Sequence, residues 1–162
     1  MVTLGFFVGG FFFGSFLEYW GHRLMHRSHG AFGKTHRDHH AENSGQGVLK
    51  EFWDYFKPTW FVMLPMFLVS LEAGVGWALG TFLYTWFCAF GHQLQHENPT
   101  KCFWMRMPVH YVHHNNNMWR HNFGLAVDWW DYVFRTYKPV EGWQQGIDPA
   151  LYNRPIWKIR WW

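Results

Sequence analysis

Apolar positions along the chain are gathered into two long blocks that polar segments separate. The first block covers 3–20, where Glu18 is the only charged residue. A helix of this length spans about 27 Å, close to the roughly 30 Å of a bilayer's hydrocarbon core. The second block, 58–91, is too long for one crossing and has a glycine-rich break in its middle. The pattern therefore predicts a membrane helix over 3–20 and a helical hairpin with arms over 58–71 and 77–91.

The two polar segments, 22–57 and 92–162, contain all 14 Lys and Arg residues of the chain. Such residues are enriched in the cytoplasmic loops of membrane proteins. We therefore expect the polar segments to face the cytoplasm, and the N-terminus and the hairpin tip to face the other side. The predicted fold class is an all-α integral membrane protein with about three transmembrane or hairpin helices and a cytoplasmic helical cap, in a single domain over 1–162.

Composition supports a membrane protein and argues against a nucleic-acid partner. Charged residues make up 15% of the chain and aromatic residues 23%, whereas an average soluble protein is about 25% charged. The net charge is +3, but the basic residues are scattered among His and Trp and form no stripe. The two cysteines, Cys88 and Cys102, form no CxxC pair and indicate no disulfide framework. The first apolar block lacks a basic segment before it, so no cleavable signal is expected.

Histidines form the most regular pattern in the polar segments. An HxxxH pair is followed by an HxxHH triplet, and the same order occurs a second time. On a helix, residues three and four positions apart share one face, so each cluster presents its rings together. Of the 12 histidines, only His29 and His121 lie outside the clusters. The clustered ones are His22, His26, His36, His39, His40, His92, His96, His110, His113 and His114.

These clusters predict two metal ions. Neutral imidazole binds Zn, Cu, Fe and Ni well, and ten rings exceed the ligands that one ion of about four- to six-fold coordination accepts. The alternative is a set of hydrogen-bonded core histidines with a metal-binding surface. Carboxylates that accept hydrogen bonds from ligand rings often orient them. The candidates for that role, each of which also suits a helix cap or a surface charge, are Glu18, Asp38, Glu97, Asp128 and Asp131.

The order of these motifs resembles the membrane-bound fatty acid hydroxylase/sterol desaturase superfamily. The resemblance covers about 18–138 and rests on Tyr19–His26, His36–His40, His92–His96, His110–His114 and a closing segment, Asn122–Thr136. It implies a helical membrane protein with a di-iron centre that uses O2 and two electrons to hydroxylate or desaturate a lipid. It also implies that the ten clustered histidines are the metal ligands. His121 has no counterpart in the pattern, so we place it near the centre without a defined role.

The resemblance also implies cofactors and partners. We expect two iron ions, O2 and electrons from a separate protein, because the chain carries no cytochrome-like donor domain. Zinc can replace iron in a purified sample, since zinc binds such sites more tightly. The first and third motifs are HxxxH, whereas the similarly compact bacterial carotenoid hydroxylases have HxxxxH, which favours a fatty-acyl or sterol-like substrate. A carotenoid hydroxylase and a non-catalytic metal-binding membrane protein are the alternatives. We expect the protein to lie in a membrane such as the cell inner membrane or that of the endoplasmic reticulum.

Overall fold

All regular secondary structure is helical in the part that the structure, a computed structural model, describes, which is residues 2–162. Within this range there are no strands, so the all-α prediction is confirmed. Short 3-10 turns η1 (Trp60–Met63), η2 (Pro65–Leu68), η3 (Pro99–Lys101) and η4 (Pro149–Asn153) link or follow the helices. The α-helices are α1 (Val2–Met25), α2 (Ala31–Glu42), α3 (Val48–Thr59), α4 (Leu71–Glu97), α5 (Val109–Asn115) and α6 (Trp129–Val133).

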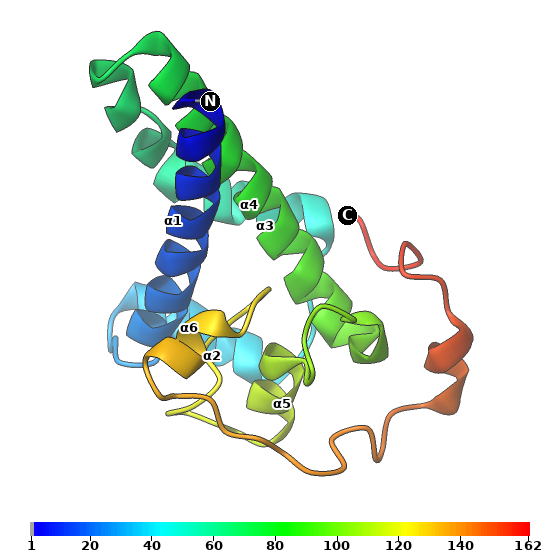
Figure 1. The fold of residues 1–162 in the computed structure, drawn as a ribbon. Coiled ribbons are helices and arrows are strands. Elements are labelled where there is room, and N and C mark those ends of the chain that lie inside the picture. The colour runs from blue at the N-terminus through cyan, green and yellow to red at the C-terminus, as the bar shows by residue number, and fades with distance from the viewer. Residues whose placement is uncertain (1) are drawn as a thin grey trace.

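Two long helices, α1 and α4, form the axis of the molecule and run side by side in the same direction (Figure 1). Glycines bring their backbones close together. A side chain at Gly10 would collide with the carbonyl oxygen of Trp77, and one at Gly80 would collide with that of Phe7. Small residues therefore allow close helix packing here, as they do between membrane helices.

The predicted hairpin over 58–71 and 77–91 is wrong in the position of its break. Helix α4 begins at Leu71 and continues without interruption to Glu97. The Ser70 side chain caps it by accepting a hydrogen bond from the backbone N–H of Ala73 at 3.1 Å. A serine N-cap and an acidic residue in the first turn both stabilise a helix start, and Glu72 occupies that first turn.

The first arm of that hairpin is also not one helix. Pro58 lies at the end of α3, and Pro65 opens the second of two 3-10 turns. Proline removes a backbone donor and disfavours a continuous helix through its position. Gly74, expected at the break, instead lies inside α4, where a side chain would collide with the ring of Phe67. In this region the glycines allow close packing, and the prolines interrupt the helix.

By length and composition, α4 is the one helix within residues 2–162 that qualifies to cross a bilayer. The three predicted crossings are therefore not confirmed. Their number, and the orientation of the polar segments toward the cytoplasm, stay predictions.

The histidine-bearing ends of α1 and α4 lie at the same end of the molecule, because the two helices are parallel. Helices α2, α5 and α6 gather at that end (Figure 1). The C-terminal segment returns to the start of α3, where Leu49 donates its backbone N–H to the carbonyl oxygen of Trp161 at 2.8 Å. This arrangement brings four histidine-bearing segments to one place.

Candidate metal centre

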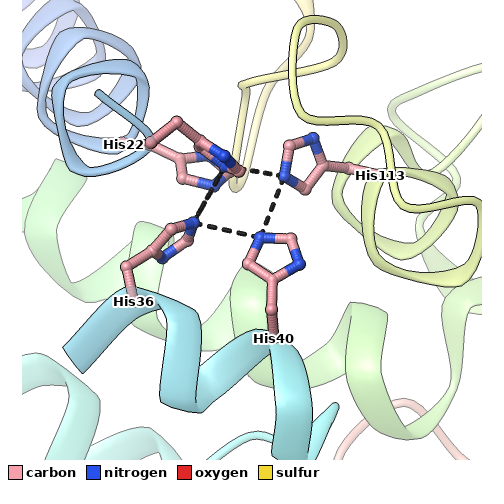
Figure 2. A group of neighbouring side chains, drawn as sticks. His22, His36, His40 and His113 are labelled. Carbon is pink, nitrogen blue, oxygen red and sulfur yellow. Dashed lines mark hydrogen bonds between the residues drawn. The ribbon is translucent and has the colours of Figure 1, made fainter. Parts of the chain in front are cut away.

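Each histidine motif presents its rings on one face, as the spacing predicted. Helix α1 and the residue that follows it carry the first HxxxH pair, and the end of α4 carries the second. Helices α2 and α5 carry the two HxxHH triplets. Figure 2 shows rings from three of these helices pointing toward one another: His22, His36, His40 and His113.

Five rings form what we call the first histidine group, consisting of His22, His26, His36, His40 and His113. One nitrogen of each lies within 4.8 Å of the corresponding nitrogen of every other. The Nε2 atoms of His22 and His36 are 3.1 Å apart, and those of His26 and His113 are 2.9 Å apart.

Four rings form the second histidine group, consisting of His39, His92, His96 and His110. The Nε2 atom of His39 lies 3.1 Å from that of His92 and 3.3 Å from that of His96. The Nε2 atoms of His96 and His110 are 3.1 Å apart. Helices α2 and α5 each contribute rings to both groups, so the groups adjoin.

The tenth predicted ligand, His114, lies between the two groups. Its ring stacks on His40 with centroids 3.9 Å apart and lies 4.5 Å from the ring of His110. It is buried, and neither of its ring nitrogens has a hydrogen-bond partner among the described residues. The structure therefore gathers nine of the ten rings into two convergent groups and places His114 against both.

The nitrogens of the first group fit a metal ion better than a hydrogen-bonded network. His22 Nδ1 faces the carbonyl oxygen of Phe123 at 2.6 Å, and His113 Nδ1 faces that of His121 at 2.7 Å. A carbonyl oxygen only accepts, so each Nδ1 of these neutral rings carries the hydrogen and each Nε2 presents a lone pair. These lone pairs point into the space that all five rings share. A cation at that point would bind all of these lone pairs at once. A hydrogen-bond donor could satisfy only one of them.

Burial keeps the rings in the neutral form that binds metals. Loss of contact with water, reinforced by neighbouring imidazoles, lowers the pKa of His36 to about 2 and that of His39 to about 3. The same loss of solvation lowers the pKa of both His26 and His40 to about 4. At neutral pH these four rings therefore carry no charge. No proton has to leave an imidazolium before a metal ion can bind.

Glu51 orients a ring of the second group, although no sequence motif indicated this role. Its carboxylate accepts a hydrogen bond from His92 Nδ1 at 2.5 Å, and both side chains are buried. This contact turns His92 Nε2 toward His39. The two residues lie 41 positions apart on different helices, so no local spacing pointed to the pair.

The carboxylates expected to hold the rings contact other groups. Glu18 accepts from the backbone N–H of Leu125 at 2.5 Å and from the Tyr84 hydroxyl. Asp38 forms an exposed ion pair with Lys34.

The remaining three predicted acceptors are also displaced from the rings. Glu97 accepts hydrogen bonds from the Gln93 side chain and the Arg160 backbone, and Asp128 precedes α6 as its N-cap residue. Asp131 acts one step away, because it accepts from the backbone N–H groups of Phe123 and Gly124, each at 2.8 Å. It thereby fixes the position of Phe123, whose carbonyl oxygen accepts the hydrogen bond from His22 Nδ1. His121, likewise, contributes its backbone carbonyl and not its ring.

An apolar cavity of about 630 Å³ leads to the histidines. Helices α1, α2, α3 and α4 bound it, and its apolar walls include Leu17, Met25, Val62 and Met63. It reaches rings of both groups, namely His22, His36, His39, His92 and His110. On α4 the lining runs from Thr81 to His92, which corresponds to about 16 Å along the helix axis. Such a space suits an extended apolar chain with one end at the histidines.

Together these features define an all-helical protein with a histidine-rich centre compatible with metal binding. The sequence profile of the fatty acid hydroxylase family matches residues 7–136, and the chain belongs to that family. The resemblance inferred from the histidine motifs is thereby confirmed. Comparison with curated proteins and with solved structures finds no match. Membership makes the protein an oxidoreductase of the lipid hydroxylase or desaturase type, in a family that is in general iron-dependent and membrane-associated.

Proposed function

We propose that this protein is a membrane-bound, O2-dependent lipid hydroxylase whose two histidine groups each hold one iron ion, with His114 completing the ligands. The observation that carries the proposal is the convergence of buried imidazole nitrogens in two adjoining groups. The matched family supports iron as the metal. The substrate that best suits the cavity is a fatty-acyl or sterol-like chain.

Iron bound in these groups would supply the reduction of O2 and the oxidation of an unactivated C–H bond, which side chains cannot perform. The chain's own residues bind, orient and exclude water. Glu51 holds His92, and the carbonyl oxygens of Phe123 and His121 hold His22 and His113. Each of these contacts fixes the ring tautomer that presents Nε2 to the shared space.

The cavity favours an enzyme over a non-catalytic metal store. A store needs ligands and a route for the ion, whereas this cavity is apolar and touches both groups. An apolar chain within it places a carbon atom beside the histidines and displaces water from them. Side chains of α1 and α4 then determine which carbon lies there.

Lipid mass spectrometry tests the proposal directly. Cells with and without the protein are grown under O2 labelled with oxygen-18, and their lipids are compared. A labelled hydroxyl that depends on the protein supports hydroxylation and identifies the substrate. A new double bond without label assigns a desaturase, and unchanged lipids together with bound metal assign a metal-binding protein.

Histidine variants link the product to the centre. His113→Ala and His40→Ala should lose bound iron and product together, because each removes one ring of the first group. His29→Ala is the matched control, since this exposed histidine lies outside both groups. Full product formation by a metal-depleted His113→Ala protein would reject the proposed function.

A further inference from the structure

One exposed aromatic side chain touches the first histidine group from outside. The Trp119 indole stacks on the ring of His40 with centroids 5.0 Å apart and an interplanar angle of 22°. It also meets the ring of His26 edge to face at 4.9 Å. Trp119 is nevertheless 43% exposed. A single side chain therefore connects the surface of the protein to two rings of the group.

Trp119 lies away from the apolar cavity. The rings that line the cavity include His22 and His36 of the first group, but neither His26 nor His40. Trp119 covers the latter two, and it does not line the cavity either. The centre thus has an apolar approach that suits a lipid and a separate aromatic contact that opens to the surface.

The surface around Trp119 is polar and basic. A hollow of about 430 Å³ is lined by Trp119 with Arg120, Lys138 and neighbouring residues that are polar except for Met118. Both basic side chains are exposed, and no acidic residue lines the hollow. Opposite charge on a partner accelerates encounter and sets orientation more than it adds affinity. Such a rim suits a transient acidic partner that must dock repeatedly.

We propose that the surface formed by Trp119, Arg120 and Lys138 is the docking site of an acidic one-electron carrier protein, whose electrons reach the histidine centre through the Trp119 indole. The inference rests on the proposed function, which requires two electrons for each O2. Each docking event would pass one electron from the carrier to an iron ion held by the histidines, so two events would supply the two electrons of one turnover. The indole is exposed on one side and contacts the rings of His26 and His40 on the other, so it provides a direct path from the surface to the histidine centre.

The test uses iron-loaded protein in detergent and a reduced plant-type [2Fe–2S] ferredoxin as the acidic carrier. Stopped-flow absorbance measures the rate at which ferredoxin is oxidised, and dithionite serves as a small reductant that needs no docking. The variants are Trp119→Leu, Trp119→Phe and the double charge reversal R120E/K138E. The matched control is W157L/K158E, because Trp157 is 69% exposed and lies with Lys158 in the C-terminal segment.

We expect Trp119→Leu to slow ferredoxin oxidation by about tenfold or more, as loss of an interface tryptophan does, while reduction by dithionite and iron content stay unchanged. Trp119→Phe keeps an aromatic contact and should retain most of the rate. R120E/K138E should slow association by about tenfold at low salt and remove most of its salt dependence. It should weaken ferredoxin binding to the metal-free protein as well, and the control should change neither measurement.

Two results would overturn the docking site. One is wild-type protein that dithionite reduces and ferredoxin does not. The other is a set of variants that ferredoxin reduces at the wild-type rate, which would leave Trp119 as a cover over His26 and His40. Failure of the proposed function has a different signature, because the wild-type centre would then bind no iron or accept no electrons from dithionite.

Discussion

Glu51 of α3 and His92 of α4 form a buried hydrogen bond of 2.5 Å that orients a ring of the second histidine group. Carboxylates in this position raise the basicity of a ligand ring and fix its tautomer. Glu51 also accepts from the backbone N–H of Gln46 at 2.9 Å. The contact therefore ties the loop before α3 to the histidine-bearing end of α4.

Removing this carboxylate should weaken metal binding. Glu51→Ala should lower iron affinity by about 10- to 100-fold, the usual effect of losing a group that holds a ligand ring. Glu51→Gln should lower it less, because an amide oxygen still accepts from Nδ1. Competition with a chelator measures the affinity. Asp38→Asn, which alters an exposed ion pair, is the control, and equal affinities in all four proteins would contradict the role given to Glu51.

The cavity predicts a position where added volume blocks lipid binding. A side chain at Gly21 would meet nothing within 4 Å, and Gly21 lines the cavity next to His22. Gly21→Leu should lower lipid affinity by about tenfold or more, as a misfit of similar size does in apolar pockets. Displacement of a fluorescent fatty acid from metal-free protein measures this without turnover.

A matched glycine on the same helix provides the control for that experiment. Gly5 also has open space around it, but it does not line the cavity. Gly5→Leu should leave lipid affinity unchanged. Equal losses in both variants would indicate a general effect on α1 and not occupation of the cavity.

Asp131 should be a major determinant of stability. Its buried carboxylate accepts hydrogen bonds from two backbone N–H groups and from the Thr136 hydroxyl. Asp131→Ala leaves these donors without a partner, at a cost of about 1–3 kcal/mol for each buried group. The free energy of unfolding of metal-free protein should fall accordingly. Asp54→Ala, which removes an exposed ion pair with Lys50, should change it by less than about 1 kcal/mol.

Metal-free protein should lose stability in acid. Burial lowers the pKa of His36 to about 2, that of His39 to about 3 and that of His40 to about 4, all from the ordinary value of 6.5. Below pH 6.5 the unfolded chain binds protons that the folded protein rejects, so stability falls as pH falls. The loss continues until the folded rings protonate, at about pH 4 and below.

Thermal unfolding of the metal-free protein between pH 7.5 and pH 4.5 tests this prediction. The contribution of these rings to the unfolding temperature should be constant above pH 6.5 and decline below it, because below that pH the unfolded histidines bind protons that the folded rings do not. A constant unfolding temperature across the range would contradict it. His29→Ala, at an exposed position outside both groups, should leave the profile unchanged.

Features that depend on spacing within one helix could be predicted from the sequence, whereas contacts between distant helices could not. The histidine faces followed from spacings within one helix, and the structure brings nine of the ten expected rings into two groups. The start of α4 was predicted wrongly, because the Ser70 cap stabilises the helix start more than Gly74 and Gly76 weaken it. These two glycines allow close contact with the Phe67 ring and with the backbone of α1. The Glu51–His92 contact joins helices far apart in sequence, and only the folded arrangement reveals it.

Adjacent residues of α2 serve different groups, since His39 belongs to the second and His40 to the first. Helix α5 divides its rings in the same way, with His110 in one group and His113 in the other. An ion held by either group restrains helices that carry ligands of both groups. Binding of the second ion therefore costs less conformational entropy of the protein. The two ions should accordingly load cooperatively, and partly filled protein should be scarce at equilibrium.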